Sequence, residues 1–170
     1  MSVLVYRDGC LAVDSGCFQG DIYTGSVKKM LIIPSGLVAG VGNYDDVIQF
    51  FDWFKNNRDT EKPSLGGPFT GIYVHQSGEV LHYDNSLSPF TIQAPFIAEG
   101  SGREIALGAL AKGASAREAV QITCRFCVRT REPIYWATVP FDWDKYSEDN
   151  QPPQQVITRA PWWRRWKGEA

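Results

Sequence analysis

Short apolar runs separated by turn residues fill the first quarter of the chain. Residues 3–6 (VLVY) and 10–13 (CLAV) flank an Asp-Gly dipeptide, a pattern that predicts a β-hairpin. A second pair of apolar runs, 27–33 (VKKMLII) and 37–42 (LVAGVG), is separated by a Pro-Ser-Gly turn. This part of the chain is therefore predicted to be rich in strands.

A helix is predicted directly after these strands. Asn43 stands at the cap position, and Asp45 and Asp46 follow in the first turn, where negative charge complements the helix dipole. Apolar residues then recur at helical spacing. The predicted buried stripe consists of Val47, Phe50, Phe51 and Phe54, widened by Ile48 and Trp53.

Alternation typical of strands returns at 69–76 (FTGIYVHQ) and 79–84 (EVLHYD), which a Ser-Gly turn joins into another hairpin. The segment 94–102 (APFIAEGSG) follows and leads into a helix over 105–113. Ser115, with Glu118 three residues later, forms a capping box at the start of one more helix.

The order of elements predicts an α+β fold. Two sheets, each with one face toward the other and one face toward helices, would form a layered sandwich. We place the core at residues 1–130. Residues 131–170 carry proline, aromatic and charged residues with little periodicity, and we interpret them as a C-terminal extension that ends in a Trp/Arg-rich tail.

Composition narrows the possible functions. The 170 residues carry a net charge of −2, with a pI near 5.7, which argues against a general electrostatic attraction to nucleic acid. No run approaches the roughly 18 apolar residues of a membrane span, so we expect a cytoplasmic protein. The cysteines are expected to be free thiols rather than a disulfide framework; they are Cys10, Cys17, Cys124 and Cys127.

Familiar catalytic arrangements find little support. His75 and His82 are the only histidines, and both lie in segments whose alternating pattern predicts strands. A Ser-His-Asp or Cys-His site is therefore disfavoured. The CRFC motif (124–127) has no second pair of ligands at zinc spacing, and the glycine-rich segment 100–110 does not complete a phosphate-binding pattern. We predict neither a metal nor a cofactor.

The N-terminus offers a different chemistry. A free α-amine has a pKa near 7.7–8.0, so a terminal Ser or Thr carries a nucleophile and a general base on one residue. Ser2 gains this property once Met1 is removed. Such a site also needs a cation, a carboxylate to hold that cation and backbone N–H groups for an oxyanion; Lys28 or Lys29, Asp14 and a glycine-rich turn are candidates.

These features together resemble a known family. The segments SVLVYRDGCLAVDS, GSVKKM, VAGVGN, AEGSG and GASAREAV are similar in order and spacing to the proteasome β-subunits among the N-terminal nucleophile (Ntn) hydrolases. Within them the closest resemblance is to the bacterial HslV-type peptidase and its short, often phage-encoded relatives. The resemblance runs from residue 2 to about residue 128.

The resemblance implies a four-layer αββα sandwich that cleaves peptide or amide bonds. It makes Ser2 the nucleophile, Asp14 the first-hairpin carboxylate and Lys29 the cation. Gly42 takes the oxyanion position, and Ser101 supports the terminal amine. Read without the family, Lys29 is a solvated strand residue, Asp14 a turn former, Gly42 a hinge before the helix and Ser101 a helix cap.

The chain departs from the family pattern at several places. Serine replaces the usual threonine, and Val3 replaces the common second hydroxyl residue. Arg125 aligns with a late aspartate, and a cation there would lower the pKa of the terminal amine. Too few residues lie between the helix after Asn43 and the strand at 69–76 for the second helix of ring-forming relatives, so a docked ATPase partner is not implied.

Two functions therefore stand side by side. One is a peptidase that acts on protein or peptide substrates, as a homo-oligomer in the cytoplasm. The other is a catalytically silent Ntn-fold protein that serves as an assembly or virion component. In the second reading the tail residues Trp162, Trp163 and Trp166 make contacts with neighbouring subunits. Neither reading calls for nucleic acid or a membrane.

Overall fold

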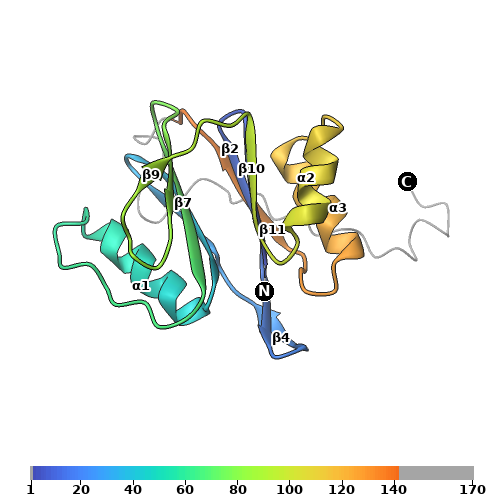
Figure 1. Cartoon of the computed structure of the whole chain (residues 1–170), viewed down its shortest axis with the longest axis horizontal. Helices are drawn as coiled ribbons and strands as arrows, with labels where there is room; N and C mark the ends of the chain where they lie inside the picture. Colours follow the sequence, from blue (N-terminus) through green and yellow to red (C-terminus); the bar gives the residue numbers. More distant parts are fainter. Residues whose placement is uncertain (1, 142–170) are drawn as a thin grey trace.

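The computed structural model describes residues 2–141, which form two antiparallel sheets and three helices (Figure 1). The four-stranded sheet has the order β10 (Phe96–Gly100), β1 (Val3–Arg7), β2 (Cys10–Asp14) and β11 (Ile134–Thr138). The five-stranded sheet has the order β5 (Met30–Ile33), β6 (Gly36–Gly42), β7 (Phe69–His75), β8 (Val80–Tyr83) and β9 (Phe90–Thr91). A separate hairpin consists of β3 (Gly16–Gln19) and β4 (Ile22–Ser26).

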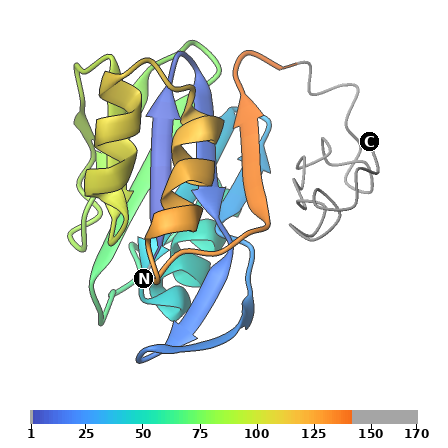
Figure 2. The same cartoon turned by 90° about the vertical axis from the view of Figure 1, so that its right-hand side faces the viewer.

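The elements stack in four layers, as the resemblance implies. Helix α1 (Tyr44–Lys55) covers the outer face of the five-stranded sheet. Helices α2 (Arg103–Ala111) and α3 (Ala116–Phe126) cover the outer face of the four-stranded sheet (Figures 1 and 2). The predicted α+β class and αββα order are therefore confirmed.

Side-chain alternation along the strands separates the hydrophobic core into layers. In β1, Leu4 points between the two sheets, while Val3 and Val5 point toward α2 and α3. The layer between the sheets also takes Val13 from β2 and Ile72 from β7. Because successive residues face opposite sides, the position of Leu4 also puts Ser2, two residues earlier, on the inner side of its sheet.

Helix α1 begins and packs largely as its sequence predicts. Asn43 accepts a hydrogen bond from the Asp45 N–H at 2.9 Å, which confirms the cap. The buried face consists of Asp46, Val47, Phe50, Phe51, Trp53 and Phe54. Ile48 is exposed instead, because the helix presents only one broad face to the sheet.

Buried Asp46 has a structural partner that the sequence does not reveal. Its carboxylate accepts hydrogen bonds from the backbone N–H groups of Gly66 and Gly67, at 3.1 and 2.8 Å. This contact holds the polar segment 56–68 against the start of α1. The predicted capping box of α3 is also confirmed, since Ser115 and Glu118 bond reciprocally.

The folded core extends past residue 130, where the sequence analysis places its end. Strand β11 pairs with β2 along its whole length, with Tyr135 opposite Val13, and Ile134 is fully buried. The short run IYWAT gives too little periodicity to stand out among its proline and charged neighbours. The tail tryptophans Trp162, Trp163 and Trp166 lie outside the described residues. Within residues 2–141, no helix combines the length and apolar character that crossing a membrane requires.

Ile134→Ala tests whether β11 belongs to the core. The substitution should lower the free energy of unfolding by about 2–5 kcal/mol, because it empties space at a fully buried position. Val128→Ala is the control: Val128 is 74% exposed, and its loss should cost less than about 0.5 kcal/mol. Urea denaturation followed by circular dichroism measures both. Equal, small costs would contradict the placement of β11 in the core.

Candidate active site

Ser2, Asp14 and Lys29 meet at one end of the sheets, close to the N-terminus. Ser2 precedes β1, Asp14 ends β2, and Lys29 comes just before β5, so three separate strand ends bring them together. All three are buried, with exposed fractions of 2%, 0% and 4%. Of the two lysines that the sequence offers, Lys29 faces this site and Lys28 lies at the surface.

The Lys29 ammonium has three oxygen partners. Its Nζ donates to Ser2 Oγ at 2.6 Å and to Asp14 Oδ1 at 3.1 Å. It also donates to the backbone oxygen of Gly16 at 2.6 Å. An ammonium group has three N–H donors, so these contacts use its full capacity.

Asp14 is held as firmly as Lys29. Its Oδ1 also accepts from the Val3 N–H at 2.9 Å, and its Oδ2 accepts from the N–H groups of Gly16 and Arg131 at 3.0 and 3.1 Å. The carboxylate thus binds β1, the start of β3 and the segment before β11 at once. This position is not that of a surface turn former, the alternative that the sequence leaves open.

Burial has opposite effects on the two charged groups. It lowers the pKa of Lys29 below its ordinary value of 10.5, while the nearby Asp14 acts in the other direction. Burial raises the pKa of Asp14, and the Lys29 charge and the N–H donors oppose that change. A lysine with a lowered pKa gives up its proton more readily than a free lysine.

Ser101 lies on the other side of Ser2, just after β10. The Ser2 N–H donates to Ser101 Oγ at 3.1 Å, and the Ser101 hydroxyl contacts the Ser2 backbone oxygen at 3.2 Å. The Gly102 N–H donates to the same oxygen at 3.2 Å. The cap residue of α2 is Gly102, so Ser101 is not the helix cap that the alternative reading proposes.

Gly42 ends β6 beside the site and has a backbone that requires glycine. Its φ is +120°, and a Cβ atom there would collide with the backbone oxygen of Pro68. The neighbouring Asn43 N–H donates to that same oxygen at 2.8 Å. Gly42 therefore packs closely against the chain just before β7, and it lines the same cleft as Ser2 and Lys29.

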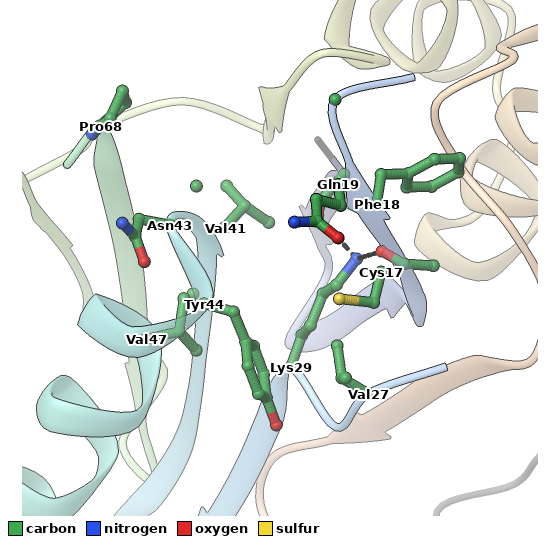
Figure 3. Close-up of a pocket in the computed structure, with 15 residues that line it drawn as sticks. Cys17, Phe18, Gln19, Val27, Lys29, Val41, Asn43, Tyr44, Val47 and Pro68 are labelled. Atoms are coloured by element: carbon green, nitrogen blue, oxygen red, sulfur yellow. Dashed lines mark hydrogen bonds between the residues drawn. The ribbon is translucent and has the colours of Figure 1, made fainter. Parts of the chain in front are cut away.

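The cleft next to Ser2 has a volume of about 570 Å³. Figure 3 shows Cys17, Phe18 and Gln19 on one side of it and Tyr44 and Val47 on the α1 side. Among the described residues that line it, Lys29 alone carries a charge, and Asp14 and Ser2 already contact its ammonium. Cys17, Tyr44 and this wall could not be predicted from the sequence, because single residues on irregular strands give no periodic signal.

Arg125 does not reach the site. It is exposed on α3 and lines a groove with Lys112 on the outer face, so the predicted effect on the terminal amine is wrong. The neighbouring Cys124 is the residue that faces inward: Asp14 and Lys29 both act electrostatically on its thiol. Burial raises the pKa of Cys124 to about 12, so this thiol stays neutral beside the pair.

The remaining candidates lie elsewhere. His75 bonds to Ser77, and His82 bonds to Glu99 at 3.3 Å between β8 and β10. All four cysteines are free thiols, as predicted. No cluster of three or more His, Cys, Asp or Glu side chains suited to a metal ion occurs within residues 2–141.

Comparisons with known proteins address the fold. No protein-family model and no curated protein matches the chain. Among solved structures, HslV from Trypanosoma brucei is similar with a TM-score of 0.63 and 18% identity, over 82% of this chain and 99% of that one. A Thiobacillus denitrificans protein, BPH, solved in complex with epoxomicin, is similar with a TM-score of 0.59 and 15% identity, again over 82% of this chain and 99% of that one. With its four layers and its N-terminal site, the chain has the fold of the HslV-type and proteasome-type Ntn hydrolases.

Proposed function

We propose that this protein is an Ntn hydrolase that cleaves peptide or amide bonds with Ser2 after removal of Met1. The observation that carries the proposal is the 2.6 Å contact between Ser2 Oγ and the buried Lys29 Nζ, at the edge of a 570 Å³ cleft. A buried cation at this distance stabilises negative charge on the serine oxygen more strongly than it would in water.

The reaction follows from the groups around Ser2. Removal of Met1 frees an α-amine whose ordinary pKa near 7.7–8.0 suits a general base. This amine takes the hydroxyl proton while Oγ bonds to the carbonyl carbon of the substrate, and Lys29 stabilises the negative charge. The C–N bond then breaks, the proton passes to the leaving amine, and water hydrolyses the resulting ester.

Ser101 and Gly42 have supporting roles in this proposal. Ser101 Oγ accepts from the Ser2 nitrogen and would orient the amine toward its own hydroxyl. The Gly40 N–H donates to the Lys29 backbone oxygen, and strand alternation gives the Gly42 N–H the same edge of β6, beside the cleft. A donor there can receive the oxyanion, a contact whose loss typically costs about 10²–10³ in turnover.

A peptide is the substrate class that fits the cleft. Its lining is largely uncharged, and its two walls are the β3 strand and the start of α1. A protein of similar fold, BPH, was solved in complex with epoxomicin. As part of the proposal, we extend ligand binding to the cleft of the present chain.

A homo-oligomer belongs to the same proposal. Ile22, Phe126 and Val128 are exposed by 72–74%, and the Asp21–Arg129 ion pair at 3.2 Å joins the two segments that carry them. Clustered exposed apolar side chains are typical of contact surfaces.

Labelling of the N-terminus tests the nucleophile. Protein without Met1, incubated with a peptide epoxyketone, should gain one probe mass on the Ser2 peptide, because hydroxyl and amine converge there. Ser2→Ala should reduce the label to background, whereas Ser88→Ala, an exposed hydroxyl in another loop, should leave it unchanged. Intact-mass and peptide mass spectrometry measure the label. Failure of the Met1-free protein to react, or equal labelling of Ser2→Ala, would contradict the proposal.

The pH dependence of labelling tests Lys29. The rate should rise as the α-amine loses its proton around pH 8. It should fall again below pH 10.5, because the lowered pKa of Lys29 removes the cation there. Arginine keeps its charge above pH 12, so in a folded Lys29→Arg protein that retains activity the labelling rate should no longer fall at high pH. A wild-type rate that still climbs above pH 10.5 would show that the Lys29 charge has no part in the reaction.

A further inference from the structure

One wall of the cleft stands outside both large sheets. The β3–β4 hairpin forms its own two-stranded sheet, at the same end of the molecule as the N-terminus (Figures 1 and 2). Residues 16–20 of this hairpin nevertheless line the cleft. An isolated two-stranded hairpin is marginally stable in water, so contacts with the rest of the protein must fix its position.

Arg131 supplies one such contact. Its guanidinium lies 5.6 Å from the centre of the Phe18 ring, and Nη1 donates to the backbone oxygens of Thr130 at 2.8 Å and Cys127 at 3.5 Å. Figure 3 shows the Phe18 ring directed away from Lys29. Arg131 therefore packs against a side chain of the strand that lines the cleft.

The absence of a side chain at Gly16 allows Phe18 and Arg131 to approach each other. A Cβ atom at Gly16 would lie 2.8 Å from the Phe18 ring and 3.0 Å from Arg131 Cβ, so only glycine lets the two side chains meet here. The same glycine gives its oxygen to Lys29 and its N–H to Asp14. The position of the wall and the position of the charged pair are thus fixed through one residue.

Arg129 makes a second contact at the far end of the hairpin. Its Nη2 donates to Asp21 Oδ1 at 3.2 Å, in the turn between β3 and β4. Both side chains are substantially exposed, at 49% and 85%, so this ion pair alone contributes little. It acts together with Arg131 from the same short segment, residues 127–133, between α3 and β11.

We propose that Arg131, assisted by Arg129, is a positioning residue that holds the β3–β4 hairpin in place as the substrate-binding wall of the cleft. The structural part of this proposal concerns the hairpin alone. Its effect on substrate binding rests on the proposed function. Neither guanidinium is assigned a contact with the reacting atoms, so substitutions should weaken binding of a peptide rather than the chemical step.

Hydrogen exchange tests the structural part without any need for activity. In the Arg129→Met/Arg131→Met variant, amides of residues 17–25 should exchange roughly 5- to 10-fold faster, since a cation–π contact and charged hydrogen bonds are lost. Amides of β1 and β6 should be unchanged. Arg125→Met removes an exposed arginine from α3 and is the matched control. Unchanged exchange in the hairpin, or an equal increase in Arg125→Met, would overturn the proposal.

Labelling kinetics test the functional part. With a peptide epoxyketone, the double variant should show an inhibition constant raised about 5-fold, with a maximal rate within 2-fold of the wild type. A lower maximal rate at an unchanged constant would overturn the proposal, because Arg131 would then act on the nucleophile. If wild-type protein does not react at all, the proposed hydrolase function fails, while the exchange experiment still decides the role of the arginines.

Single substitutions guard against loss of folding. Arg131→Met keeps the backbone N–H that binds Asp14, and Arg131→Lys also keeps a cation near Phe18. Circular dichroism establishes that each variant is folded. Exchange in the hairpin should follow the order wild type, Arg131→Lys, Arg131→Met, from slow to fast. A folded Arg131→Met protein with wild-type exchange in residues 17–25 would also overturn the proposal.

Discussion

The organisation of the site depends on a lysine ammonium held away from water. A buried charge is costly unless every donor finds a partner. Lys29 meets this condition through Ser2 Oγ, Asp14 Oδ1 and the Gly16 backbone oxygen. Each partner belongs to a different stretch of the chain, so the end of β2 and the beginnings of β1, β3 and β5 must converge at one point. The serine that would perform the chemistry is thereby fixed by the same contacts that make the burial of the charge tolerable.

The two-sheet architecture makes that convergence possible. Alternating side chains fill the space between the sheets over most of their length, with Leu4, Val13 and Ile72 in that layer. At the end where Ser2 and Lys29 lie, the β3–β4 hairpin and the start of α1 form the walls of a cleft. The ends of the packed sheets therefore carry Ser2, Asp14 and Lys29, while one wall of the cleft is a hairpin outside both sheets. Under the proposed function, this arrangement holds the nucleophile firmly and leaves the substrate-binding wall to an element with fewer supporting contacts.

Regular elements could be predicted because each carries a periodic signal. The stripe of Phe50, Phe51 and Phe54 and the Asn43 cap define α1. Alternation and an Asp-Gly turn define the first hairpin. The needs of a terminal nucleophile predict Ser2, Asp14 and one of two lysines, and the resemblance in motif order adds Lys29 and Ser101. The structure brings these four residues together. Their catalytic roles, and that of Gly42, stay predictions.

The parts that escaped prediction are those fixed by long-range contacts. Strand β11 is defined by pairing with β2 more than a hundred residues earlier, and β3 by contacts with Asp14 and Arg131. The resemblance aligns Arg125 with a late aspartate of the family, and on a helix an alignment error of one residue turns the side chain through about a quarter of a turn. Cys124 faces the pair instead.

The most direct test of this account is an NMR titration of the Lys29 side chain, followed by its ¹³Cε resonance in protein that lacks Met1. The account predicts a pKa below the ordinary 10.5, since burial outweighs the attraction of Asp14. It also predicts that Ser2→Ala alters the titration, because Ser2 Oγ is one of the three partners of Nζ. A midpoint at or above 10.5 that Ser2→Ala leaves unchanged would mean that Lys29 is solvated and apart from the serine, which would contradict the account.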